Sequence, residues 1–287
     1  MSSNVILGLA TRQNLLSLQN VNDQISKSQN ALATGLKVSS AVDNAVSFFQ
    51  AQSLNQRASD LTQRKGQIDQ GISSVTTATQ GVQSVVSTLE QLQGILQSAA
   101  TESAAQRSAA GTQFGTIAQQ LNNLVNAASY QGLNLINSTK SALKLQFSIT
   151  STDTFKISGS NLQVSVLVTA GKVLASNLAS KLVGKKFSAV SNSTSLFTTA
   201  FNSLQNAVFK AQATAQSLGG NVTFLQTRES FTAQYVTTLQ GGADKLVVAD
   251  VNAESTNLVT LQTRQQLSIQ SLSIATQSEQ AVLRLFH

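Results

Sequence analysis

The 287-residue chain contains no proline. A typical protein of this length would hold about fourteen, because proline makes up about 5% of average sequences. One proline inside a helix costs about 3 kcal/mol, so its absence favours long, uninterrupted helices. Apolar residues also recur along most of the chain at alternating steps of four and three, which is the spacing of a coiled-coil seam. The sequence therefore predicts a mainly α fold.

Three central helices are predicted to form a long antiparallel coiled-coil bundle. They cover about 47–100, 107–128 and 192–235, and the first has the seam Ile68, Ile72, Val75, Thr79, Val82, Val86, Leu89, Gln93 and Leu96. A glycine pair at 219–220 interrupts the third, where we expect a kink or close packing. The side chains that we expect to line the bundle are Ile72, Val75, Val82, Leu89, Ile117, Leu121, Leu124, Phe201, Leu204, Val208, Leu218 and Leu225.

The two ends of the chain are predicted to be paired helices, 4–33 and 250–286. The last helix has one seam through Leu261 and Leu272 and a second through Leu267 and Ile274, so it needs neighbours on more than one side. We expect it to be buried in an assembly; docking on its own domain alone is the alternative. The candidate self-assembly residues are Leu18, Val21, Ile25, Leu32, Leu258, Leu261, Leu267, Leu272, Ile274, Leu283 and Leu285.

Connectors and a small β module complete the predicted plan. Residues 34–46 and 238–249 contain glycine and polar residues and are predicted as connectors of about a dozen residues each. Alternation of apolar residues in 143–149, 155–157 and 162–166 predicts a β-hairpin region, followed by an uncertain segment. The predicted domains are thus 1–46 with 238–287 (terminal helices), 47–139 with 187–237 (bundle), and 140–186 (an outward, lysine-rich β module).

Charge and composition exclude several classes of function. Residues 140–186 hold seven lysines and one acidic residue, giving net +6 of the chain's +7, but lack the interleaved aromatic and arginine pattern of single-strand nucleic-acid binders. A solvated lysine face is the simpler reading, with no nucleic-acid or membrane partner. No segment approaches the roughly 18 apolar residues of a spanning helix, and no signal peptide is visible. Without cysteine, and with histidine only at His287, no catalytic triad, metal site or cofactor site is expected, so the chain is not expected to be an enzyme.

Both ends of the chain resemble the bacterial flagellins. Residues 28–43 read SQNALATGLKVSSAVD, residues 130–136 read YQGLNLI, and residues 261–286 read LQTRQQLSIQSLSIATQSEQAVLRLF. Each run is similar to a flagellin motif, in the expected order. The shortness of the middle segment suits a short flagellin, and glutamines at 91 and 93 resemble the α-proteobacterial type.

The resemblance implies a structural subunit that self-assembles into the extracellular flagellar filament for swimming. It also implies an export chaperone, export through the flagellar type III apparatus without a cleaved signal peptide, and junction and cap proteins as partners. Two alternatives remain open at this point. One is a hook–filament junction protein, and the other is a secreted coiled-coil adhesin that binds surfaces through the lysine-rich module.

Overall fold

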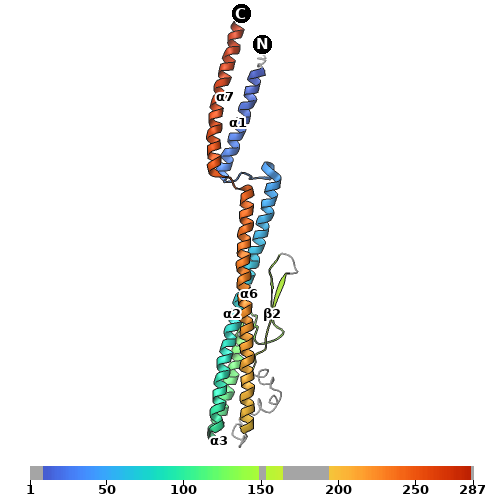
Figure 1. Cartoon of the computed structure of the whole chain (residues 1–287), viewed down its shortest axis with the longest axis vertical. Helices are drawn as coiled ribbons and strands as arrows, with labels where there is room; N and C mark the ends of the chain where they lie inside the picture. The colour runs from blue at the N-terminus through green and yellow to red at the C-terminus, as the bar shows by residue number, and fades with distance from the viewer. Residues whose placement is uncertain (1–8, 149–152, 164–193, 286–287) are drawn as a thin grey trace. The chain divides into compact units, whose positions relative to one another are not determined.

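The computed structural model describes residues 9–148, 153–163 and 194–285. The chain divides into two compact units. Unit 1 is Met1–Ala58 with Thr237–His287, and unit 2 is Ser59–Val236. Helices and one two-stranded sheet make up the described parts (Figure 1), which confirms the prediction of a mainly α fold with a hairpin in the middle of the chain. Within the described residues, no helix is both long and apolar enough to cross a membrane.

Unit 2 is built on three helices: the greater part of α2 (Ala41–Thr101), α3 (Ala104–Ala127) and the greater part of α6 (Thr194–Val247). Lys65 of α2 pairs with Glu229 of α6, and Gln93 pairs with Gln205, so the two helices run antiparallel. Between α2 and α3 the chain turns at Ser103, whose backbone N–H donates to Oε1 of Gln106 at 3.1 Å, one half of a capping box.

The bundle core follows a heptad register on α2 that differs from the predicted one. One row of core residues was predicted correctly: Ile68, Val75, Val82, Leu89 and Leu96 are all buried. The second row lies three residues after each of these, at Gly71, Ala78, Val85, Leu92 and Ala99, and is buried as well. The predicted partners one residue later, Ile72, Thr79, Val86 and Gln93, are only half-buried. Gly71 and Ala78 are small and did not stand out as apolar core positions. The predicted second row was therefore placed one residue away from the observed one.

The hairpin consists of β1 (Ala142–Gln146) and β2 (Thr154–Ser158), paired antiparallel with Leu145 opposite Phe155. Leu145 packs on α2 at Gly71, where an added Cβ would lie 2.6 Å from Leu145 Cδ1. Phe155 meets Phe224 of α6 with ring centroids 4.7 Å apart. The hairpin therefore closes over both helices. The predicted third strand is not formed in its described part: Asn161 makes a single bridge with Asn137, and Leu162, which follows it, is buried but belongs to no strand. Val164 and Val166 lie outside the described residues, and so does the uncertain segment 171–186.

The turn between α3 and the hairpin is held by a buried asparagine. Asn134 donates from Nδ2 to the carbonyls of Val125 and Asn126 at the end of α3. Its Oδ1 accepts from the backbone N–H groups of Ile136 and Asn137. One side chain thus satisfies helix-end carbonyls and turn amides together, which fixes where the chain leaves the bundle.

The second predicted connector is wrong over most of its length. Helix α6 continues through the glycine pair at 241–242 to Val247, so only about three residues separate it from α7 (Val251–Leu285). Leu239 and Ala243 are buried in this last stretch, and that packing outweighs the low helix propensity of two glycines. The predicted kink or close packing at 219–220 is also absent: the helix is unbroken there, and a Cβ on either glycine would meet nothing within 4 Å.

Candidate self-assembly surface

The terminal helices α1 (Leu9–Thr34) and α7 lie side by side in unit 1 (Figure 1). Gln265 donates to Oδ1 of Asn22 at 2.6 Å, and Asn257 donates to Oγ of Ser28 at 3.4 Å. Lower residue numbers on α1 thus meet higher ones on α7, so the pair is antiparallel. These hydrogen bonds join polar residues that lie among the apolar contact residues of α1 and α7, and they set the register of the pair.

Only one side of each terminal helix is used by this pairing. Ile25 and Leu261 are buried, at 8% and 3% exposed. The other predicted residues of this contact are half-buried; they are Leu18, Val21, Leu32, Leu258 and Leu272. The interface is thin, with small or polar side chains such as Ser28 among its buried residues.

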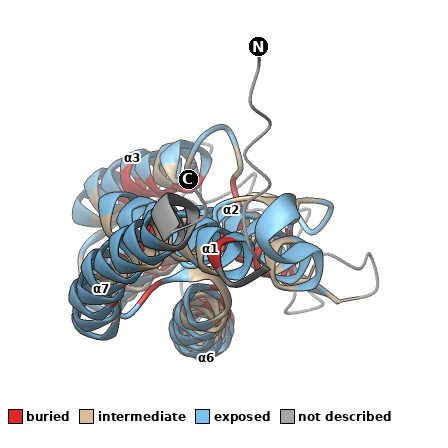
Figure 2. Ribbon diagram, turned by 90° about the horizontal axis from the view of Figure 1, so that it is seen from above, coloured by how far each residue is buried: buried red, intermediate tan, exposed pale blue. Residues whose placement is uncertain are grey.

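The second seam of α7 faces away from α1. Leu267 is 59% exposed and Ile274 is 60% exposed. At about 100° per residue, both lie on the side of the helix roughly opposite Leu261. Figure 2 colours most residues of α7 as exposed. Leu283 and Leu285 belong to α7, but their side chains lie outside the description.

Further exposed apolar residues on these helices escaped the sequence prediction. Leu16 is 59% exposed on α1, and Val259 and Ile269 are 62% and 52% exposed on α7. Val259 lies about one heptad before Leu267. An apolar residue at that spacing was the signal that could have marked it. Several exposed apolar residues on a helix whose opposite face is already occupied are the feature that makes this helix a candidate for contacts with another chain.

Two short connectors join the terminal helices to the long ones. The backbone N–H of Lys37 donates to the carbonyl of Val247 at 2.8 Å, and the N–H of Ala249 donates to the carbonyl of Gly35 at 2.9 Å. Gly35 has a φ of 72°, the left-handed conformation that commonly follows the end of a helix, and it lies directly after the last residue of α1. The connectors therefore bind each other directly, as a minimal antiparallel bridge.

Helix α2 begins with a sharp kink instead of the predicted loop through 46. Asn44 is non-helical (φ −160°, ψ 98°), and its Oδ1 caps the following helix by accepting from the N–H of Ser47. One carboxylate oxygen of Asp43 accepts four hydrogen bonds, from the backbone N–H and the hydroxyl of both Ser39 and Ser40. These bonds, the hydroxyl of Ser39 first, hold the pKa of Asp43 below its ordinary value of 3.8.

The kink presents a small apolar cluster that the sequence analysis missed. Val42 is 95% exposed, Val46 67% and Phe49 58%. These residues stand four and three residues apart, the spacing of an apolar helix stripe, and that was the available signal; the expected connector through residue 46 left it unused.

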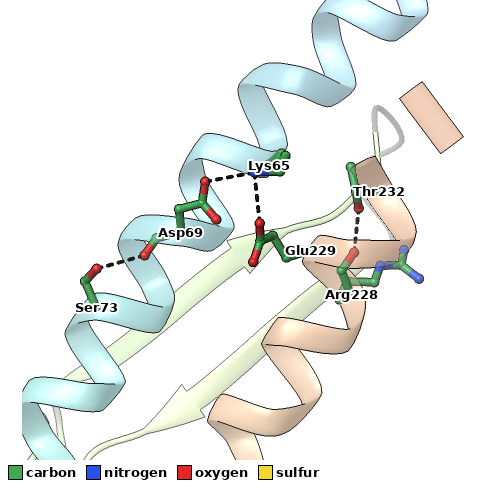
Figure 3. A network of polar contacts seen from close by, with 6 residues as sticks. All are labelled: Lys65, Asp69, Ser73, Arg228, Glu229 and Thr232. Carbon is green, nitrogen blue, oxygen red and sulfur yellow. Dashed lines mark hydrogen bonds and ion pairs between the residues drawn. The ribbon is translucent and has the colours of Figure 1, made fainter. Parts of the chain in front are cut away.

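The predicted bundle residues all lie in unit 2, and none of them belongs to the exposed seam of α7. Buried there are Val75, Val82, Leu89, Ile117, Leu121, Leu204, Val208, Leu218 and Leu225, while Ile72, Leu124 and Phe201 are half-buried. An ion-pair network joins α2 to α6 (Figure 3). Lys65 Nζ lies 2.9 Å from Glu229 and 3.3 Å from Asp69, and these contacts, Glu229 first, raise the pKa of Lys65 above 10.5.

Comparison with known proteins finds similarity to bacterial flagellins. Residues 4–141 match the family model described as the bacterial flagellin N-terminal helical region. A flagellin of Brucella melitensis is 28% identical over 273 residues, covering 95% of each chain. Flagellin FljM of Caulobacter vibrioides is 26% identical over 277 residues, again covering 95% of each.

A solved structure shows the same fold. It is that of a putative flagellar hook-associated protein from Vibrio parahaemolyticus, which superposes with a TM-score of 0.60 at 13% identity and covers 72% of this chain and all of the other. At that identity the likeness shows the fold alone. The sequence relatives that span nearly the whole chain are α-proteobacterial flagellins. The match to the flagellin N-terminal model and the flagellin relatives over 95% of the chain together support a structural subunit of the bacterial flagellar filament.

Proposed function

We propose that each subunit polymerises through the outward faces of α7 and α1, which pack on the terminal helices of neighbouring copies. The observation that carries this proposal is the exposure of Leu267 and Ile274 on a helix whose other side already contacts α1. Burying one such side chain contributes about 1.5–3 kcal/mol. Repetition of the contact along a helical polymer multiplies that gain.

We further propose that the terminal helices become fully ordered only on assembly. Ile25 and Leu261 are the predicted contact residues that the pair buries, and ordering one residue costs about 1–2 kcal/mol for the backbone alone. Most of the stability of a helix in a protein comes from tertiary packing of its apolar face, and this pair supplies little of it. Neighbouring copies supply the missing burial, so assembly is cooperative.

The test is seeded polymerisation followed by electron microscopy. We expect the full chain with short filament seeds to give long, uniform filaments. Leu267→Ser/Ile274→Ser removes two exposed side chains and should abolish elongation while leaving helix content unchanged, measured by circular dichroism. Removing residues 251–287 should abolish elongation as well.

The matched control is Gln266→Ser/Gln277→Ser on the same helix. It introduces the same residue at two exposed positions and removes no apolar surface. Normal filaments from this variant, together with loss in the apolar variant, support the proposal. Normal elongation of the apolar variant or of the truncated chain would refute it.

The remaining parts of the proposal concern the route and setting of assembly. The flagellar filament is extracellular, and we propose that the chain reaches it through the flagellar type III export apparatus with a chaperone, without cleavage of a signal peptide. Junction and cap proteins would lie at the ends of the growing polymer. The role is structural, with no catalytic step assigned to any residue.

A further inference from the structure

The exposed face of the hairpin carries two lysines directly opposite each other. Lys144 of β1 pairs with Lys156 of β2 in the strand register, and both are exposed. Their neighbours on the other face, Leu145 and Ile157, are buried. Like charges placed directly across an antiparallel pair destabilise it. An anion bound between the two ammonium groups would remove that cost.

A hollow lies along the β1 edge of the hairpin, between β1 and α2. It has a volume of about 650 Å³ and is lined by two cations, Arg64 and Lys144. The rest of its polar lining consists of amides, a hydroxyl and a phenol, those of Gln63, Gln67, Gln70, Gln131, Gln146, Ser74 and Tyr130. Among the residues that the structure describes, no aspartate or glutamate lines it.

A second hollow lies along the β2 edge, between β2 and α6. Its volume is about 490 Å³, and it again holds two cations, Lys156 and Lys210. Hydroxyls and an amide complete its polar lining, from Ser158, Ser160, Thr214, Ser217 and Asn221, and no described acidic residue lines it. The four cations thus form a series in which successive members share a hollow or face each other across the hairpin: Arg64 with Lys144, Lys144 with Lys156, and Lys156 with Lys210.

The acidic residues around this series are already paired. Asp153, in the hairpin connection, lies 2.6 Å from Arg228 of α6. Asp69 and Glu229 both contact Lys65 (Figure 3). Among the described residues, none of the four cations has a carboxylate within ion-pair distance. Their charge is therefore available to a ligand.

We propose that this cationic surface, defined by Arg64, Lys144, Lys156 and Lys210, binds acidic polysaccharide. Ammonium and guanidinium groups pair with the carboxylates or sulfates of the polymer, and the amides and hydroxyls of the two hollows hydrogen-bond its sugar hydroxyls. Nucleic acid fits less well, because the hairpin aromatics are engaged: Phe147 stacks on Phe155 with centroids 5.9 Å apart, and Phe155 packs on Phe224. Binding does not require polymerisation, although repetition along a filament raises avidity.

The test measures binding of the full-length chain to immobilised polygalacturonate and dextran sulfate at low and high salt. Neutral dextran is the reference. We expect binding to both acidic polymers, weaker at high salt, and none to neutral dextran. The two polymers separate carboxylate from sulfate as the preferred anion. Lys144→Gln/Lys156→Gln should weaken binding about tenfold or more, since two of the four cations are lost, without lowering the melting temperature.

The charge-matched control is Lys27→Gln/Lys245→Gln, which removes two exposed lysines from unit 1. It should bind acidic polysaccharide like the unaltered chain. Equal loss in both double variants would mean that net charge alone drives binding, and it would overturn the proposal. Unchanged binding by Lys144→Gln/Lys156→Gln would overturn it as well, as would equal or tighter binding of duplex DNA at the same surface. Electron microscopy should show that the hairpin variant still forms filaments. A loss of polysaccharide binding can then be told apart from a failure of assembly.

Discussion

At the scale of single residues, Gly81 of α2 lies under neighbours that leave no room for a methyl group. A Cβ there would be 2.8 Å from Cβ of Ala128 and 2.9 Å from Cδ1 of Ile136. The Cβ of alanine moves only with its backbone, so Gly81→Ala forces the turn after α3 away from the bundle. We expect a loss of about 1–3 kcal/mol in the free energy of unfolding, the usual cost of overpacking, measured by urea denaturation.

Gly94, thirteen residues further along the same helix, is the matched control. Nothing lies within 4 Å of a Cβ built on it, and the residue is exposed. Gly94→Ala should therefore raise the free energy of unfolding by up to about 1 kcal/mol, the helix propensity difference. Opposite signs for the two substitutions are the expected outcome. Stabilisation by Gly81→Ala would show that α3 does not pack here as closely as described.

At the scale of elements, periodicity predicted the helices well but not how they end or which side faces inward. The hairpin was predictable because Leu143, Leu145 and Phe155 alternate strictly. The inner face of α2 was predicted only in part, because Gly71 and Ala78 occupy core positions with little apolar surface of their own. The helical end of α6 was missed because its glycine pair argues locally against a helix. The burial of Leu239 and Ala243, which favours the helix, depends on the folded structure and cannot be read from the local sequence.

The candidate site shows the same division. The two seams of α7 could be read from heptad spacing, including which residues would share a face with Leu261. Which seam contacts α1 depends on hydrogen bonds such as that from Gln265 to Asn22, and no local pattern encodes that partner. The apolar cluster at Val42, Val46 and Phe49 was missed because residues 34–46 were predicted as a connector, whereas α2 already begins at Ala41 and is kinked at Asn44, between Val42 and Val46.

The first connector and the start of α2 should respond to acid through Asp43. Its pKa is lowered below 3.8 by hydrogen bonds from Ser39 and Ser40. A lowered pKa in the folded state means that the carboxylate stabilises this turn fully above about pH 4, and that the contribution is lost as pH falls through the folded value. In an NMR titration, we expect the Asp43 carboxyl to titrate below 3.8, and the Ser39 and Ser40 amides to lose protection over the same range.

Removal of the donors is the control for this titration. Ser39→Ala/Ser40→Ala deletes both hydroxyl hydrogen bonds and keeps both backbone ones, so the pKa of Asp43 should rise toward its ordinary value. An Asp43 carboxyl that titrates at its ordinary value in the unaltered chain would contradict the described geometry of the turn.

At the scale of the whole molecule, the two units should differ in local stability before assembly and converge after it. In unit 2, Val82, Leu121 and Leu225 are completely buried, so amides around them should exchange only through global unfolding. In unit 1, α1 and α7 share a thin interface and expose their second faces. We expect amide hydrogens of α1 and α7 to exchange at least about a hundredfold faster than the bundle amides in the free subunit, a difference of about 2.8 kcal/mol in opening free energy.

In filaments the same amides should become protected, because neighbouring copies then bury Leu267 and Ile274. Hydrogen exchange with mass spectrometry on free subunits and on seeded filaments of the same preparation gives both values, with the bundle peptides as the internal reference. Leu267→Ser/Ile274→Ser should keep α7 in fast exchange even with seeds present. Slow exchange of α1 and α7 in the free subunit would mean that the helix pair is stable by itself, so that assembly joins preformed helices instead of ordering them.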